Sequence, residues 1–120
     1  QASGHAIEAR IYAEDPVRFL PSPGPLARFE LPTGDGIRVE TGYAQGASVT
    51  PFYDPMIAKL VAHGHDRRDA IARLQAALAQ TRIEGVKTNI PFIQRILAQA
   101  DFVAGRIDTG IAQRVLSPQP

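Results

Sequence analysis

Residues 56–80 read MIAKLVAHGHDRRDAIARLQAALAQ, and their hydrophobic period changes at Asp66. The first part, 56–63, is apolar apart from one lysine, a pattern typical of a strand that reaches a core. After Asp66 the apolar residues recur at helical spacing, which predicts a helix over residues 67–80. The Asp66 side chain can cap the free N–H groups of that helix, and Asp69 three residues later resembles a looser capping box. A strand followed directly by an amphipathic helix is therefore the first structural unit that the sequence predicts.

Three further strands are predicted upstream of this unit. Residues 4–12 alternate between apolar and charged side chains, as expected for a half-buried strand. Residues 25–31 and 36–41 predict two more strands, and the turn-rich PTGDG at 32–36 lies between them. Because the connection is this short, the sequence favours an antiparallel hairpin. Two proline-containing stretches, 13–24 and 43–55, predict loops, the second with a short extended piece around Val49.

The C-terminal third predicts mainly helices. Residues 82–86 are typical of a short edge strand, and Thr88 can cap a helix that continues through Leu97, with proline tolerated in its first turn. Thr109 can cap a last helix over 110–116, after which the tail SPQP is expected to fray. Strands first and helices later indicate an α+β fold. We expect an antiparallel β-sheet with C-terminal helices packed on one face or edge, in a single domain of residues 1–120.

The composition excludes several classes of protein. Hydrophobic residues make up 44% of the chain and charged residues 21%, which is ordinary for a globular domain and argues against disorder. A net charge of +1 is too small to indicate nucleic-acid or membrane binding by bulk electrostatics. The chain has no cysteine, so disulfides, thiolate nucleophiles and cysteine-based zinc sites are excluded. No apolar run approaches the roughly 20 residues that span a bilayer, and the N-terminus is not typical of a signal peptide.

Common catalytic and metal-binding motifs are absent when each is considered alone. His63 and His65 have the spacing of two residues on one side of a strand, and without a third nearby ligand the sequence favours solvated side chains over a metal site. Glu14 and Asp15 could form a carboxylate pair, but adjacent side chains usually point apart. We therefore favour the interpretation that one of them caps the turn at Pro16. The lysine of GVKTN lacks the upstream glycine of a P-loop.

Arg38 lies in the short predicted strand IRVE. Ile37 and Val39 share one side of this strand, so Arg38 and Glu40 share the other. The simple interpretation is an exposed cross-strand charge, which most arginines on strands provide. A functional interpretation, in which the guanidinium binds a carboxylate-like group, is also open. The pattern alone favours the first.

Five segments together resemble the C-terminal domain of biotin carboxylases, in order and in spacing. They read GHAIEARIYAEDP (4–16), FLPSPG (19–24), GIRVETG (36–42), PFYDPMIAKLVAHG (51–64) and EGVKTNIPF (84–92). Such domains occur in acetyl-CoA, propionyl-CoA and methylcrotonyl-CoA carboxylases, in pyruvate carboxylase and in urea carboxylase. The YDPMIAKL version is more similar to the acyl-CoA and urea carboxylase branches.

The resemblance implies a role in an ATP-dependent ligase. In this family an ATP-grasp region binds ATP and Mg²⁺ and makes carboxyphosphate from bicarbonate, and biotin on a carrier protein is then carboxylated. The nucleotide loop, the magnesium ligands, the bicarbonate-binding residues and the base of the family lie upstream of the matched part. We therefore expect this chain to be a fragment without its ATP-grasp region, inactive alone and without a bound cofactor or metal of its own.

The resemblance also assigns roles to three residues. Arg38 stands where the family has an arginine that holds the biotin ureido oxygen as negative charge develops there, a form of transition-state stabilisation. Glu84 stands at the acidic position before GVKTN, where a carboxylate helps to orient polar groups near the biotin site. Arg67 lies in a stretch that helps to form the subunit interface in bacterial relatives.

The implied partners are the other parts of such an enzyme. They are the biotin carboxyl carrier domain, the ATP-grasp part of the same chain, a carboxyltransferase component and a second copy in a homodimer, in the cytoplasm and without nucleic acid or membrane. The main alternative is a non-catalytic scaffold or dimerisation module with the same fold. An independent small enzyme is disfavoured, because no complete nucleophile–base or metal set is visible.

Overall fold

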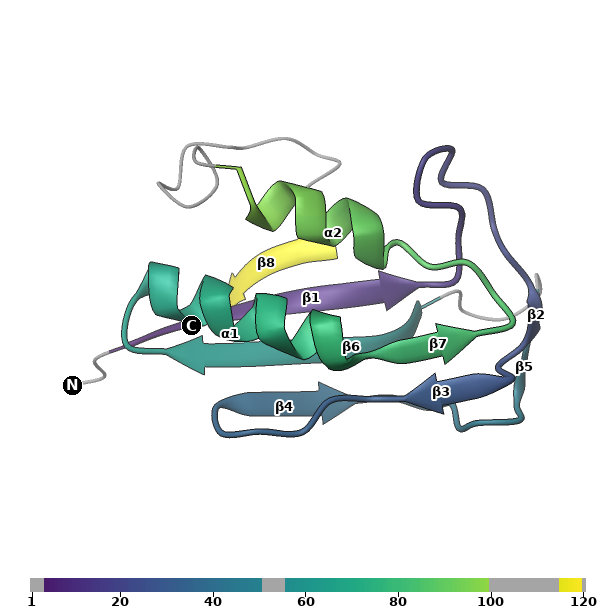
Figure 1. Ribbon diagram of the computed structural model, residues 1–120, viewed down its shortest axis with the longest axis horizontal. Coiled ribbons are helices and arrows are strands. Elements are labelled where there is room, and N and C mark those ends of the chain that lie inside the picture. The colour runs from purple at the N-terminus through teal and green to yellow at the C-terminus, as the bar shows by residue number, and fades with distance from the viewer. Residues whose placement is uncertain (1–3, 51–55, 100–114, 120) are drawn as a thin grey trace.

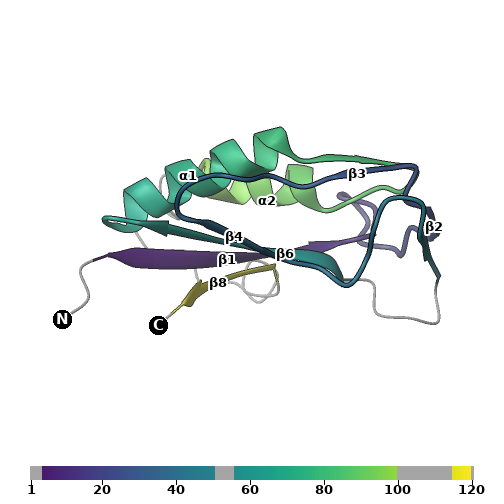
Figure 2. The ribbon, with the colours of Figure 1, turned by 90° about the horizontal axis from the view of Figure 1, so that it is seen from below.

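The computed structural model describes residues 4–50, 56–99 and 115–119. A four-stranded antiparallel sheet in the order β4-β6-β1-β8 forms its centre, and two helices lie on one face of that sheet (Figures 1 and 2). Two short antiparallel ladders, β2 with β5 and β3 with β7, complete the fold. The elements are β1 (His5–Tyr12), β2 (Gly24–Pro25), β3 (Arg28–Glu30), β4 (Ile37–Glu40), β5 (Ser48–Val49), β6 (Met56–Gly64), α1 (Arg67–Gln80), β7 (Arg82–Glu84), α2 (Ile90–Leu97) and β8 (Leu116–Gln119).

The core lies between the sheet and the helices. In the antiparallel register of β1 and β6, Ile7 lies opposite Ala62 and Ala9 opposite Leu60, and all four side chains are buried. Because side chains alternate along a strand, the charged residues of β1 and β6 fall on the other face. The α+β class is confirmed, as are the strands predicted at 4–12 and 56–63 and the extended piece at Val49. None of the helices in the described ranges has the length and apolar character to cross a bilayer.

Helix α1 covers the sheet, and its bounds coincide with the prediction of 67–80. The Asp66 carboxylate accepts the N–H of Asp69 at 2.8 Å, as expected for an N-cap. The Asp69 carboxylate accepts the N–H of His65 at 2.8 Å, one residue further back than in a standard capping box. That hydrogen bond, together with the Arg73 guanidinium, holds the pKa of Asp69 below its usual value. The residues that the helix buries are Ala70, Ile71, Leu74, Ala77 and Leu78.

The predicted hairpin between 25–31 and 36–41 is wrong. The first segment forms β3 and pairs with β7, whereas the second forms β4 and pairs with β6. The backbone shows the reason at Gly36, whose carbonyl accepts the N–H of His63 at 2.7 Å. Gly36 has a φ of +76°, and a Cβ there would lie 2.7 Å from the His63 oxygen, so glycine permits this approach. The chain after the turn is thus aligned on β6 and leaves β3 free for another partner.

The edge strand predicted at 82–86 forms as β7, but it ends at Glu84, just before Gly85. Gly85 has a φ of +105°, and a Cβ there would overlap the carbonyl oxygen of Pro25. This close approach fixes the crossing between β2 and the segment that leads to α2 (Figure 1). A larger residue at position 85 would force the two backbones apart.

Helix α2 begins one residue later than the predicted cap implies. Its N-cap is Asn89, whose side chain makes no capping bond, while the Thr88 hydroxyl accepts the N–H of Ile90 at 3.4 Å. The amide of Asn89 is instead fully buried against β1. It accepts the N–H of Tyr12 at 2.8 Å and donates to the carbonyl of Arg10 at 3.1 Å. Thr88 therefore assists the first turn, and Asn89 joins the helix to the sheet.

The C-terminal tail forms a strand where fraying was expected. Leu116 begins β8, which pairs with β1 from Ala9↔Leu116 to Ala6↔Gln119. The prediction was wrong because the outer edge of β1 offers unpaired N–H and C=O groups that an adjacent segment can satisfy. Most of the last predicted helix, with its cap at Thr109, lies outside the described residues.

Candidate functional site

The sheet face that points away from the helices carries a row of five charged side chains. Glu8 and Arg10 come from β1, Lys59 comes from β6, and Arg38 and Glu40 come from β4. The two helices leave this face uncovered in the described part of the chain (Figure 2). We call these five side chains the charged row. With three cations and two carboxylates, the row has a formal excess of one positive charge.

Charges of opposite sign alternate along the row. Arg38 Nε lies 3.3 Å from one oxygen of Glu40, and the other oxygen of Glu40 lies 3.4 Å from Lys59 Nζ. The same Nζ lies 3.8 Å from Oε1 of Glu8, whose Oε2 accepts a hydrogen bond from Arg10 Nη1 at 2.8 Å. The row therefore links the three strands β4, β6 and β1 by side-chain contacts alone.

The strand registers explain why Glu8 is needed. Lys59 lies directly opposite Glu40 on one neighbouring strand and directly opposite Arg10 on the other. Like charges in directly opposed positions repel each other. The Glu8 carboxylate contacts both cations, and its side chain is only 10% exposed. The inner end of the row is thus fixed and shielded from water.

Arg38 forms the outer end of the row. Its side chain is 66% exposed, and within the residues that the structure describes it forms an ion pair with Glu40 through Nε. The two terminal nitrogens of the guanidinium make no hydrogen bond to the residues that the structure describes. A planar, permanently charged fork of this kind can bind a carboxylate-like group or an oxygen on which negative charge develops. The geometry therefore suits an anionic ligand on the open face.

The other two predicted site residues lie elsewhere. Glu84, on β7, forms an ion pair of 3.3 Å with Arg28 on β3, outside the charged row. Arg67 is the first residue of α1, on the helical side of the sheet. The roles that the resemblance gives to these two residues remain predictions.

No functional role was predicted for the other four members of the charged row. The alternation of the β1 segment indicated that Glu8 and Arg10 share a face, and the strand IRVE placed Glu40 beside Arg38. The register that aligns Lys59 with Glu40 and Arg10 depends on long-range pairing, for which the local sequence carries no signal.

The adjacent acids of the AEDP loop have structural roles. Asp15 accepts the N–H groups of Val17 at 2.8 Å and of Arg18 at 2.9 Å, so it caps the turn at Pro16 as favoured above. These hydrogen bonds, with Lys87 Nζ at 3.4 Å, hold the pKa of Asp15 below its usual value. Glu14 is buried. Asp15 thus has the structural role that the sequence favoured for one of the two acids.

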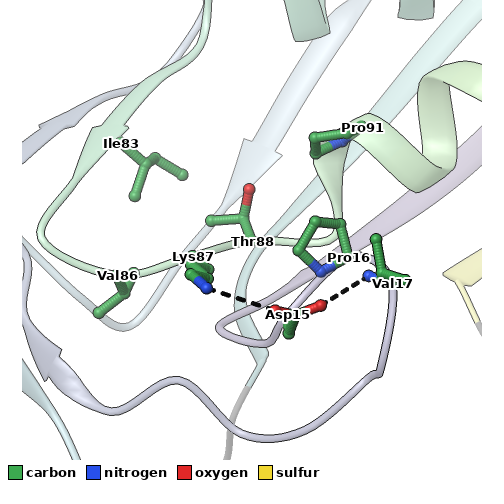
Figure 3. Close-up of a pocket in the computed structure, with 8 residues that line it drawn as sticks. All are labelled: Asp15, Pro16, Val17, Ile83, Val86, Lys87, Thr88 and Pro91. Atoms are coloured by element: carbon green, nitrogen blue, oxygen red, sulfur yellow. Dashed lines mark hydrogen bonds and ion pairs between the residues drawn. The ribbon is translucent and has the colours of Figure 1, made fainter.

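A shallow hollow of about 370 Å³ lies beside this turn (Figure 3). In Figure 3, Asp15 lies between Lys87 and Val17 and contacts both. Since its two charged residues neutralise each other, the hollow offers a mostly apolar surface without an uncompensated charge. Its lining residues are Asp15, Pro16, Val17, Ile83, Val86, Lys87, Thr88 and Pro91.

The described residues offer no recognisable metal centre. They contain no group of three or more His, Asp or Glu side chains that could hold a metal ion. His63 and His65 are both exposed at and just beyond the end of β6.

Comparison with known proteins gives a consistent picture. The family described as the biotin carboxylase C-terminal domain matches residues 8–114. The chain is 56% identical over 106 residues to a biotin carboxylase of Halalkalibacterium halodurans, covering 88% of this chain and 24% of that protein. It is 47% identical over 116 residues to biotin carboxylase 2 of Bacillus subtilis, and the match covers 97% of this chain and 26% of that protein. The structure of a biotin carboxylase of Campylobacter jejuni, solved as a beta-gamma-ATP complex, superimposes on this chain with a TM-score of 0.88 at 40% identity. The match covers 95% of this chain and 26% of that one. The chain thus spans about a quarter of the length of these relatives.

Proposed function

Because the chain belongs to the biotin carboxylase C-terminal domain family, we propose that it supplies Arg38 to the biotin site of an ATP-dependent biotin carboxylase. The observation that carries this proposal is the position of Arg38 at the exposed end of the charged row. Its side chain is 66% exposed, and its Nε lies 3.3 Å from a Glu40 oxygen. The ligand is the ureido group of biotin attached to a carrier domain.

The proposed chemistry assigns a limited task to this chain. Transfer of the γ-phosphoryl group of ATP to bicarbonate gives carboxyphosphate, which breaks down to CO₂ and inorganic phosphate. A base removes the proton from the ureido nitrogen, and that nitrogen then forms the new N–C bond to CO₂. As the proton leaves, negative charge develops on the ureido oxygen. The Arg38 guanidinium stabilises that oxygen, and such preorganised donors typically contribute about 10²–10³ in rate.

The remaining parts of the reaction are assigned to other segments. The residues described in this chain do not form a metal-ligand cluster, and its sequence has no phosphate-binding glycine loop. ATP and Mg²⁺ are therefore assigned to an ATP-grasp region, and the base to the same region. The description of the Campylobacter jejuni relative as a beta-gamma-ATP complex supports a nucleotide site in the whole enzyme.

Glu84 and Arg67 complete the proposal as supporting residues. Glu84 pairs with Arg28 at 3.3 Å and its side chain is 63% exposed, so it remains available to a polar group brought by the carrier. Arg67 begins helix α1, on the face opposite to Arg38. A subunit interface at Arg67 would therefore leave the charged row open to biotin.

The test uses a full-length enzyme in which this chain forms the C-terminal domain. Arg38→Ala should slow the fixation of radiolabelled bicarbonate into free biotin by about 10²–10³. Arg68→Ala is the matched control, since Arg68 is an exposed arginine of α1 on the opposite side of the sheet. Undiminished carboxylation by the Arg38→Ala enzyme would overturn the assignment of Arg38 to the biotin site.

A further inference from the structure

Two arginine–glutamate pairs with the same spacing differ in how the arginine is held. On β3, Arg28 Nε lies 3.0 Å from Glu30, and its terminal nitrogens bind Glu30 at 3.2 Å and Glu84 at 3.3 Å. These hydrogen bonds, first from Glu30 and then from Glu84, hold the pKa of Arg28 above its usual value. On β4, Glu40 contacts Arg38 through Nε. The Arg28 guanidinium therefore binds two carboxylates, whereas the terminal nitrogens of Arg38 remain available to a ligand.

Lys59 accounts for this difference. One oxygen of Glu40 lies 3.4 Å from Lys59 Nζ, and the other lies 3.3 Å from Arg38 Nε. This arrangement differs from a bidentate arginine pair, in which both carboxylate oxygens accept parallel hydrogen bonds from one guanidinium. Lys59 in turn is directly opposite Glu40 in the β4–β6 register and contacts the shielded Glu8. The position of the Glu40 carboxylate is thus determined from the inner end of the charged row.

We propose that Glu40 is a positioning residue, which orients the Arg38 guanidinium through Nε and leaves its terminal nitrogens for the ligand. This inference rests on the proposed function of Arg38. A long exposed arginine loses rotamer freedom when it binds, and a side chain that is already oriented loses less. Since an exposed ion pair contributes up to about 1 kcal/mol, the expected gain is about fivefold in kcat/KM.

The experiment is a double-mutant cycle in the full-length enzyme, with kcat and KM for free biotin as the readout. Glu40→Gln keeps the size of the side chain and removes its charge, and it should lower kcat/KM for biotin about fivefold. In an Arg38→Ala background the same change should have no further effect, because a positioning residue acts only through its partner. Bicarbonate-dependent ATP cleavage without biotin should be unchanged, which shows that the variant is folded.

The matched control is Glu30→Gln, on the other arginine–glutamate pair. Glu30 is 55% exposed and Glu40 50%, and each contacts the arginine two residues before it. A loss with Glu40→Gln no larger than with Glu30→Gln would overturn the inference, as would an equal loss in the presence and absence of Arg38. If Arg38→Ala itself retains full carboxylation, the proposed function fails instead, so the two failures can be told apart.

Discussion

The side-chain amide of Asn89 accepts the backbone N–H of Tyr12 at 2.8 Å, across 77 positions of the sequence. The same amide donates to the carbonyl of Arg10 at 3.1 Å, and the backbone N–H of Asn89 donates to the carbonyl of Tyr12 at 3.3 Å. Asn89 thus pairs with the end of β1 as a further strand would. It fixes the start of α2 to the strand whose other face carries Glu8 and Arg10.

Asn89→Ala should lower the free energy of unfolding of the chain by about 2–6 kcal/mol. Two backbone groups that are satisfied by the amide would be left without partners, and each typically costs about 1–3 kcal/mol when buried. Urea unfolding followed by circular dichroism measures the change. Gln99→Ala, at an exposed amide beyond α2, is the control and should stay within about 0.5 kcal/mol of the wild type. Equal stability of the two variants would contradict a structural role for Asn89.

Glu8→Gln should lower the free energy of unfolding by about 1–3 kcal/mol. The change preserves side-chain size but removes the charge that separates Arg10 from Lys59, two cations in directly opposed positions of β1 and β6. Because Glu8 is 10% exposed, water screens these contacts weakly. Glu30→Gln, at an exposed ion pair, should change stability much less than Glu8→Gln does. A Glu8→Gln chain that unfolds at the same urea concentration as the wild type would show that the inner end of the row is not needed for folding.

Acid should weaken the start of α1 through Asp69. The pKa of this carboxyl is lowered in the fold, because it accepts the His65 N–H and lies beside Arg73. A group with a lowered folded pKa contributes stability above its ordinary value of 3.8, and this contribution is lost as pH falls through the folded pKa. Unfolding midpoints measured from about pH 6 to about pH 2 should therefore converge for wild type and Asp69→Asn at the acid end. A constant difference over the whole range would contradict this.

Elements of the fold that depend on local sequence signals could be predicted. The pairing of strands far apart in the sequence could not. The bounds of α1 follow from Asp66 and a clear helical period, both of which are local signals. The partners of β3 and β4 were wrong, because the contact of Gly36 with His63 decides which edge the chain follows. At the candidate site, the alternation of IRVE placed Arg38 and Glu40 on one face. The Glu40 carboxylate lies between Arg38 and Lys59 because the register of β4 and β6 places Lys59 opposite Glu40. Residue spacing within one strand could not predict this contact.

Arg38→Lys should reduce biotin carboxylation by about 10-fold or more, yet less than Arg38→Ala. Lysine keeps the positive charge but presents a compact ammonium in place of a planar fork, so it lacks both the Nε contact with Glu40 and a second terminal nitrogen. Charge alone would recover part of the stabilisation of the ureido oxygen. The measurement is kcat for free biotin in the full-length enzyme at saturating ATP and bicarbonate. Wild-type kcat in the Arg38→Lys enzyme would mean that a single positive charge suffices, in which case the orientation of the guanidinium by Glu40 has no part in the rate.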